Sequence, residues 1–229
     1  MRILAFDTST EWLSVAAGDG ASWCAHEERA GSTNSERILP TIDAVLAQSG
    51  WRLADLDGIA FGAGPGAFTG VRIACSVAQG LAFGADLPLA AIPSLTALAQ
   101  QASRTAGATR VCACLDARMR EVYLACYSRE GDGWRTERAP VVIKPIDVEL
   151  PSGQWDGAGD GFAAYAELAS VRGLSRVHPQ LRPTARSIGE LALPVFARGQ
   201  GVTASEARPF YVRQRVALTA SERSAGMRL

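Results

Sequence analysis

Apolar runs interrupted by short polar stretches dominate the first hundred residues. Residues 2–20 contain two apolar runs separated by the polar sequence DTST and followed by a Gly-Asp-Gly turn, which predicts a β-hairpin with polar groups at its tip. Residues 56–66 predict a buried strand that ends in a glycine-rich loop, and residues 88–94 predict a further strand. These strands and the helical segments between them indicate an α/β fold.

Helical periodicity occupies the intervening segments. Residues 32–50 begin with serine and asparagine candidates for the N-cap and end at a glycine, and Pro40 is expected to kink this helix or to mark the start of its regular part. Residues 68–84 predict a helix of small residues, and Ser94 is expected to cap a helix over residues 95–102. The aliphatic residues that share one face of the first helix are Ile38, Leu39, Ile42, Val45 and Leu46.

The order of features at residues 2–20 recurs at residues 109–131. The second segment again consists of a strand, a polar bend, a strand and a glycine-containing turn, and the two segments align on the aspartates at their tips. Such an internal duplication predicts two similar halves, residues 1–104 and 105–229, each starting with a β-hairpin.

The remainder of the second half carries weaker signals. Residues 130–160 are rich in glycine, proline and charge, which predicts irregular connections. Helical patterns occupy residues 162–171 and 187–199, and residues 207–213 predict a short strand before an arginine-rich tail. We expect this terminal segment to pack back on the first half.

The charge balance limits the classes of partner. The formal net charge is zero, and Lys144 is the only lysine among 229 residues. No overall field therefore draws the protein to nucleic acid or to an anionic membrane, so any contact with RNA must be local or made through a partner. From Arg208 onward the chain carries five arginines against one acid, Glu222. This tail is the best candidate for contact with phosphate, and a solvated terminus is an equally good interpretation.

The sequence has no signal typical of export, membrane insertion or metal binding. The apolar run before Asp7 is too short for a signal peptide, and no later stretch is apolar for long enough to cross a bilayer, so we expect a cytoplasmic protein. The cysteines form no CxxC pair, which favours reduced core thiols, and Cys112 and Cys114 would share one strand face. Neither His26 nor His178 has neighbours at ligand spacing, so we predict no metal site and no cofactor.

The glycine-rich loop GAGPGAFTGVR, residues 62–72, invites comparison with phosphate-binding loops. Its glycines are mis-spaced for a P-loop, no lysine follows them, and the dinucleotide pattern GxGxxG fails at Ala67. Two interpretations remain: a weak anion site at the free N–H groups near Thr69 and Gly70, or glycines that permit close packing of a neighbouring backbone. We favour close packing.

Aspartates at both hairpin tips indicate a relic of nucleotide binding. In nucleotide-dependent proteins with duplicated hairpins, a tip aspartate holds the metal while small hydroxyl residues approach the phosphates. The first tip keeps such groups, whereas Arg118 and Met119 fill the space at the second. The glycine turn in residues 156–165 either packs on an adenosine or simply starts a helix. The candidate vestigial nucleotide or phosphate site comprises Asp7, Thr8, Ser9, Asp116, Gly159 and Gly161. No nucleophile in a triad context accompanies them, so the sequence indicates no catalytic set.

Six segments resemble the TsaB (YeaZ) family of bacterial tRNA threonylcarbamoyladenosine biosynthesis proteins. In the order and spacing of the family they are ILAFDTSTEWLSVA, SERILPTIDAVL, GPGAFTGVRIACSVAQGLAFG, IPSLTALA, LDARMREVYLACY and ARPFYVR. The resemblance covers nearly the whole chain and implies a duplicated actin-like fold of the ribonuclease H type. It also implies a non-catalytic scaffold for a TsaD-type subunit, which transfers a threonylcarbamoyl group to the adenosine beside the anticodon, with a TsaE-type ATPase completing the set.

The resemblance further implies a partner interface on helices of the first half. This interface would serve a homodimer when the protein is alone and the TsaD-type subunit in the complex, with tRNA contacted only indirectly or weakly. Family members often carry a histidine where this chain has Asn34, and residues 32–37 lack the histidine pair with which the catalytic relative holds a metal. The expected interface residues are Ile38, Leu39, Ile42, Gly66, Phe68, Thr69, Arg72, Ser76 and Gln79.

Two other functions stay open at this point. An ATP-dependent small-molecule kinase of the same fold would need a general base near Asp7 and measurable affinity for nucleotide. A metallopeptidase of the M22 type would need a bound metal.

Overall fold

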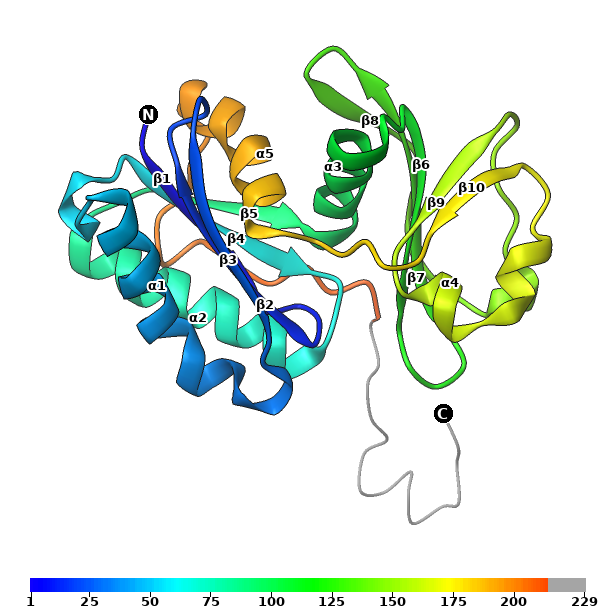
Figure 1. Cartoon of the computed structure of the whole chain (residues 1–229), viewed down its shortest axis with the longest axis horizontal. Helices are drawn as coiled ribbons and strands as arrows, with labels where there is room; N and C mark the ends of the chain where they lie inside the picture. The colour runs from blue at the N-terminus through cyan, green and yellow to red at the C-terminus, as the bar shows by residue number, and fades with distance from the viewer. Residues whose placement is uncertain (214–229) are drawn as a thin grey trace.

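The computed structural model describes residues 1–213, which form two lobes, each built on one five-stranded sheet (Figure 1). In the first sheet the strand order is β3-β2-β1-β4-β5. The central strand β1 pairs antiparallel with β2 and parallel with β4. The strands of this sheet are β1 (Ile3–Asp7), β2 (Trp12–Gly18), β3 (Trp23–Arg29), β4 (Gly58–Gly64) and β5 (Leu89–Pro93).

The second sheet repeats the first strand for strand. Its order is β10-β9-β6-β7-β8, and β6 pairs antiparallel with β7 and parallel with β9, as β1 does with β2 and β4. The strands are β6 (Arg110–Asp116), β7 (Val122–Glu130), β8 (Gly133–Ile143), β9 (Trp155–Ala158) and β10 (Leu174–His178). The prediction of an α/β fold with two similar halves, each starting with a hairpin, is therefore confirmed.

Helices bury both faces of the first sheet. Two helices, α1 (Asn34–Ser49) and α2 (Phe68–Ala85), pack against one face, and α5 (Ala185–Ala197) packs against the other (Figure 1). Because both faces are covered, β1 and β4 are buried along their whole length. Their sequences are therefore nearly continuous apolar runs, without the alternation of apolar and polar residues that is typical of half-exposed strands. Helix α1 ends at Gly50, which adopts the left-handed conformation at its C-cap as predicted.

The two halves exchange helices. Helix α3 (Ser94–Ala106) precedes the second sheet in the chain and packs against it, with Leu95 and Leu98 in the same apolar cluster as Val111. Helix α5 follows the second sheet but returns to the first, where the Ala185 N–H donates to Ser14 Oγ over 2.8 Å. The expected boundary between residues 104 and 105 thus divides the strands but not the helices that cover them.

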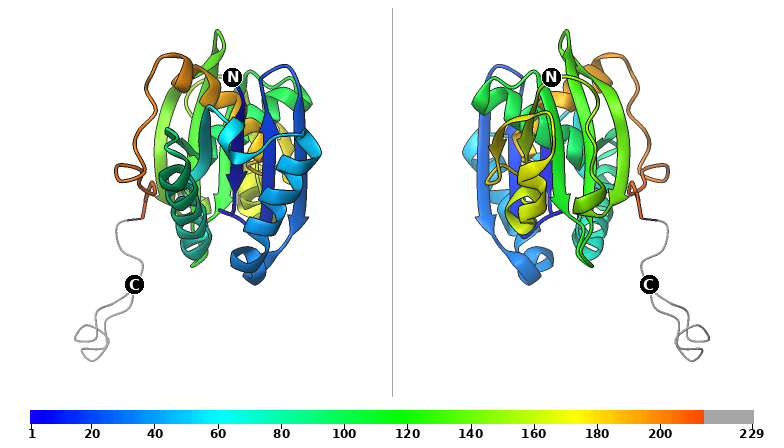
Figure 2. Two further views of the ribbon diagram at one scale, coloured as in Figure 1. Left: turned by 90° about the vertical axis from the view of Figure 1, so that its left-hand side faces the viewer. Right: turned by 90° about the vertical axis from the view of Figure 1, so that its right-hand side faces the viewer.

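Residues 198–213 run back along the first lobe, beside α2 (Figure 2). The Phe210 N–H donates to the Ala63 carbonyl over 2.7 Å, and Gln79 Nε2 donates to the Ala207 carbonyl over 3.1 Å. The strand expected over residues 207–213 does not form, because the segment makes single hydrogen bonds to β4 and α2 in place of a ladder.

Several predicted elements differ from the structure. Residues 130–160, expected to be irregular, contain β8 and β9, and the edge strands β3 and β10 were not predicted. The helix expected over residues 162–171 is reduced to α4 (Gly161–Ala164) and a 3-10 turn (Ala166–Ser170). Ser94 is the first residue of α3 and does not cap it; its hydroxyl instead accepts a hydrogen bond from the Gly64 N–H over 3.2 Å. Further 3-10 turns are Gly31–Thr33, Leu53–Asp55 and Pro145–Asp147.

The cysteines are free thiols. Cys112 and Cys114 are buried in one apolar cluster of the second lobe, which confirms the predicted shared face, and Cys126 lies opposite Cys112 on β7. Burial raises the pKa of the Cys114 thiol, which therefore stays protonated and packs as a small apolar side chain.

Candidate functional site

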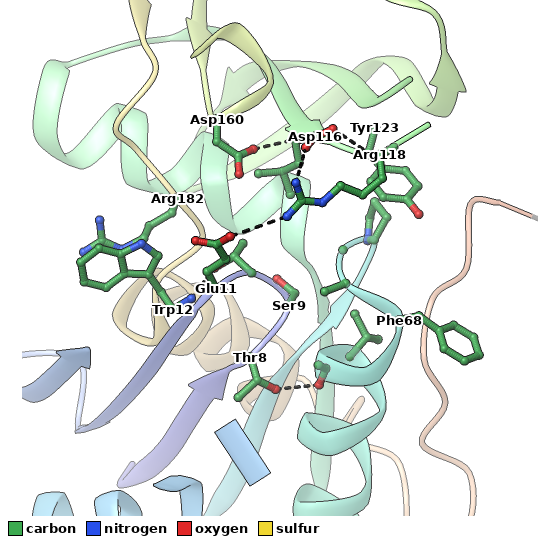
Figure 3. Close-up of a pocket in the computed structure, with 18 of the residues that line it drawn as sticks. Thr8, Ser9, Glu11, Trp12, Phe68, Asp116, Arg118, Tyr123, Asp160 and Arg182 are labelled. Carbon is green, nitrogen blue, oxygen red and sulfur yellow. Dashed lines mark hydrogen bonds and ion pairs between the residues drawn. The ribbon is translucent and has the colours of Figure 1, made fainter. Parts of the chain in front are cut away.

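A cleft of about 1180 Å³ lies between the two lobes. Both hairpin bends line it, together with the start of α2 and residues 179–182 and 210–213 (Figure 3). The duplication explains this arrangement, because it brings the equivalent tips of β1–β2 and β6–β7 to face each other across the space between the lobes. The predicted tip residues Thr8, Ser9 and Asp116 line the cleft, and Asp7 lies behind them.

Asp7, at the end of β1, is a buried carboxylate. It is 1% exposed, and its Oδ1 accepts hydrogen bonds from the Ser9 N–H over 2.9 Å and the Ser9 hydroxyl over 2.8 Å. Its Oδ2 has no hydrogen-bond partner within the described residues. Burial raises the pKa of Asp7 from 3.8 to about 6, and the hydrogen bonds from Ser9 oppose this shift without cancelling it.

The glycine-rich loop packs directly on this hairpin tip. The Thr8 hydroxyl donates to the Gly70 carbonyl in the first turn of α2 over 2.6 Å (Figure 3). A Cβ atom at Gly70 would overlap the Thr8 carbonyl oxygen, one at Gly66 would overlap the Ser9 carbonyl oxygen, and one at Gly62 would overlap the Asp7 carboxylate. The prediction that glycines permit close approach of a neighbouring backbone is confirmed at Gly66 and Gly70, and that backbone belongs to the chain itself.

Arg118 spans the cleft from the second tip to the first (Figure 3). Its guanidinium lies 3.1 Å from the Asp116 carboxylate on its own hairpin and 3.6 Å from the Glu11 carboxylate on the other. Glu11 also pairs with Arg29 over 2.6 Å, and both arginines hold the pKa of Glu11 below its ordinary value, with the Arg29 hydrogen bond contributing most. This position agrees with the prediction that the Arg118 side chain occupies the space beside the second hairpin tip.

Gly159 and Gly161 serve the second sheet rather than the cleft. Both are buried against Cys114 of β6: a Cβ at Gly159 would overlap the Cys114 carbonyl oxygen, and one at Gly161 would press on the Cys114 sulfur. Only Asp160, between them, lines the cleft, and its Oδ1 accepts from the Asp116 N–H over 3.0 Å. Gly159 and Gly161 are therefore not among the residues that line the cleft, and their part in a vestigial nucleotide site stays a prediction.

The β6–β7 bend carries a feature that the sequence did not reveal. Arg118, Met119 and Arg120 all adopt left-handed backbone conformations, with φ of 59°, 56° and 58°. Such conformations cost non-glycine residues about 1 kcal/mol each, so neighbouring contacts must hold the bend in place. Arg213 supplies two of them by donating to the Glu121 carboxylate over 2.6 Å and to the Ala117 carbonyl over 3.1 Å.

This backbone strain predicts an unusual order of stability at Arg120. We expect Arg120→Gly to be more stable than Arg120→Ala by about 1 kcal/mol, because only glycine adopts the left-handed conformation without a steric cost. Both variants lose the same exposed ion pair with Glu167, so the comparison isolates the backbone. Urea denaturation of the two variants measures the difference in their free energies of unfolding. Equal urea midpoints for Arg120→Gly and Arg120→Ala would show that the bend is not strained.

The exposed face of α2 includes most of the residues predicted for the interface. Phe68, Thr69, Arg72 and Ser76 are exposed, Gly66 in the preceding loop is half-buried, and Gln79 is half-buried under residue 207. Phe83, which was not among the predicted interface residues, is 84% exposed on the same stripe. We call this stripe the α2 face; it consists of Phe68, Thr69, Arg72, Ser76, Gln79 and Phe83.

The α1 predictions need a correction. Ile38 and Ile42 are 1% and 2% exposed and pack in the core against the first sheet, so neither is available to a partner in this fold. Leu39 points away from that core and is 49% exposed. An amphipathic helix must cover its own sheet before it can serve a partner, and α1 uses its main apolar stripe for this purpose.

Comparisons with known proteins give one consistent result. The family model "TsaD: tRNA N6-adenosine threonylcarbamoyltransferase" matches residues 27–169. The curated tRNA threonylcarbamoyladenosine biosynthesis protein TsaB of Escherichia coli is 43% identical to this chain, over 95% of this chain and 96% of its own length. The TsaB protein of Haemophilus influenzae is 40% identical, over 94% of this chain and 95% of its own length. This chain belongs to the TsaB family.

The solved structures agree with this assignment to the TsaB family. YeaZ from Pseudomonas aeruginosa superposes with a TM-score of 0.87 at 42% identity, over 92% of this chain and 99% of that one. The match extends over both lobes, so the actin-like duplicated fold implied by the TsaB resemblance is confirmed.

Asn34, in the segment where the resemblance implied a missing histidine, is the first residue of α1 and is 4% exposed. Within residues 1–213 no three His, Cys, Asp or Glu side chains gather in an arrangement that could hold a metal ion. In the same part of the chain no helix has the length and apolarity needed to cross a membrane.

Proposed function

We propose that this protein acts in threonylcarbamoyladenosine biosynthesis on tRNA, as a non-catalytic scaffold that pairs with a TsaD-type catalytic subunit and a TsaE-type ATPase. The observation that carries the proposal is the 43% identity, over 95% of the chain, to a protein named for this pathway. The match of residues 27–169 to the TsaD family model supports a structural relationship to the catalytic partner. We further propose a cytoplasmic location, a homodimer in the absence of partners, and only indirect or weak contact with tRNA.

The cleft supports a non-catalytic role. The Thr8 and Ser9 hydroxyls, which would donate to phosphates in a nucleotide-dependent relative, donate instead to the Gly70 carbonyl and the Asp7 carboxylate. Arg118 crosses the space between the tips. In residues 1–213 the two hydroxyls and Arg118 are therefore engaged by other groups of the chain, which favours the scaffold over a kinase.

Reconstitution tests the proposal. The purified protein alone is expected to leave tRNA unmodified, and addition of the TsaD-type subunit, the TsaE-type ATPase and the threonylcarbamoyl-adenylate supply is expected to produce the modified nucleoside. Omission of this chain from the full mixture should abolish or strongly reduce product. Modification of tRNA by this chain alone would contradict a scaffold role.

The α2 face predicts the effect of a single charge on assembly. Phe83→Glu is expected to weaken binding of the TsaD-type subunit at least about ten-fold, because an exposed aromatic side chain on an interaction surface contributes strongly to association. Titration calorimetry measures the affinity. Ile146→Glu, which replaces an apolar residue 76% exposed in the second lobe, provides the matched control and should bind as the wild type does. Equal binding by both variants would remove Phe83 from the interface.

A further inference from the structure

A small groove separates α2 from the returning C-terminal segment. It has a volume of about 210 Å³ and is lined on one side by Arg72, Cys75, Ser76 and Gln79 and on the other by residues 207–209 and 211. Two arginines, Arg72 and Arg208, lie on opposite walls, and no carboxylate belongs to the lining. We call it the Arg72–Arg208 groove.

Aromatic contacts hold Arg72 in position. Its guanidinium lies 3.8 Å from the centroid of the Phe68 ring, and its Nε donates to the Tyr211 hydroxyl over 2.9 Å. These contacts fix the plane of the guanidinium, and within residues 1–213 they use one of its five N–H groups, which leaves the others to donate to a further acceptor. Arg72 is thus preorganised to bind an acceptor.

Arg208 faces the same groove from the C-terminal segment. One of its terminal nitrogens donates to the carbonyls of Ser205 and Ala207. The nearest acidic residue along the chain, Glu206, accepts hydrogen bonds from the N–H and hydroxyl of Thr203 and makes no ion pair with Arg208 within residues 1–213. Within residues 1–213 neither Arg72 nor Arg208 pairs with a carboxylate, whereas Arg37, for example, pairs with Glu28 over 2.8 Å.

The size and charge of the groove select its occupant. A volume of about 210 Å³ is below the range of roughly 300–1000 Å³ that is typical of pockets for nucleotides and other small molecules, but it accommodates the end of one side chain. Two arginines without an acid favour a carboxylate, which the guanidinium fork binds through paired hydrogen bonds. The groove is also continuous with the α2 face, on which we have proposed that the partner subunit docks.

We propose that the Arg72–Arg208 groove receives an aspartate or glutamate side chain of the TsaD-type subunit, whose carboxylate bridges the two arginines. The inference rests on the proposed function for the identity of the partner. It adds the chemistry of recognition and assigns a binding role to residues of the C-terminal segment, Arg208 and Tyr211, in addition to the α2 residues predicted from the sequence.

Zero-length cross-linking tests the proposal directly. Arg72→Lys and Arg208→Lys keep the positive charge and introduce an amine that a carbodiimide couples only to a carboxylate in contact with it. The chain has one lysine, Lys144, so new cross-links are easily assigned by mass spectrometry. We expect position 72 or 208 to couple to an Asp or Glu of the TsaD-type subunit. Arg172→Lys, at an exposed position of the second lobe, is the control and should give no such product.

Affinity measurements with neutral variants complete the test. Arg72→Met and Arg208→Met should each weaken binding of the TsaD-type subunit about ten-fold or more, and Arg172→Met should leave it unchanged. A complex that forms with wild-type affinity in both variants, without cross-links at 72 or 208, overturns the inference. A loss of tRNA affinity of the assembled complex, with the protein–protein affinity intact, also overturns it, because the groove would then bind a phosphate. If the wild-type chain does not bind the TsaD-type subunit at all, the proposed function itself fails.

Discussion

Replacing Gly70 by alanine will lower the free energy of unfolding by about 3 kcal/mol or more. The added Cβ would overlap the carbonyl oxygen of Thr8, which is backbone and cannot move away by a change of rotamer. The same substitution would disturb the hydrogen bond of 2.6 Å from the Thr8 hydroxyl to the Gly70 carbonyl. Equilibrium urea denaturation measures the change.

Gly80 on the same helix provides the control. A Cβ at Gly80 meets nothing within 4 Å, so Gly80→Ala should raise stability by about 0.5–1 kcal/mol through its higher helix propensity. The two substitutions are chemically identical and are expected to act in opposite directions. If both variants were stabilised, the close packing of α2 on the first hairpin tip would not exist in solution.

Replacing Asp7 by asparagine will stabilise the protein at pH 7.5 by up to about 3 kcal/mol, the free energy that corresponds to a pKa raised from 3.8 to about 6. The folded state binds the proton of Asp7 more tightly than the unfolded state does. Stability of the wild type therefore falls as the pH rises from about 3.8 to about 6 and stays at the lower level above that window. Asparagine is neutral throughout, and its carbonyl can still accept both hydrogen bonds from Ser9.

The difference between wild type and Asp7→Asn should consequently disappear near pH 3.5. Urea denaturation at pH 3.5 and 7.5 gives both values. Asp43→Asn, which removes an exposed charge from α1, should change stability by less than about 0.5 kcal/mol at either pH. Equal stability of wild type and Asp7→Asn at pH 7.5 would mean that the ionised carboxylate is compensated by a contact that is absent from the structure.

The sequence predicts β1, β2, β4, β5, β6 and β7 but misses three edge strands, β3, β8 and β10, mainly because these are exposed. The internal strand β9 is buried, but it is only four residues long and lies in a glycine-rich stretch. Strands β1 and β6 are enclosed by helices or by neighbouring strands, so their apolar runs stand out. The edge strands β8 and β10 face solvent and carry charged residues such as Arg135 and Arg176, which mask the periodicity. Residues 130–160, which contain β8, are also rich in glycine, proline and charged residues, and this composition predicts an irregular connection in place of a strand.

The site was predictable where it depends on local sequence and not where it depends on long-range contacts. The duplicated aspartates and the close-packing glycines follow from short motifs. Periodicity identifies Ile38, Leu39 and Ile42 as apolar, but it does not say which of them cover the chain's own sheet. The left-handed bend lacks a glycine to mark it, and the contacts of Arg213 with that bend link positions more than ninety residues apart.

Because the helices are exchanged between the lobes, the core of the first lobe cannot be completed until α5 has been synthesised. Until α5 has left the ribosome, the face of the first sheet formed by residues such as Ile3, Ala5 and Ala60 lacks the helix that covers most of it, although its strands were made first. The nascent N-terminal half therefore presents apolar surface to chaperones while nearly the whole second half is being translated. Truncation before residue 185 leaves both lobes' strands present but one of their cores open.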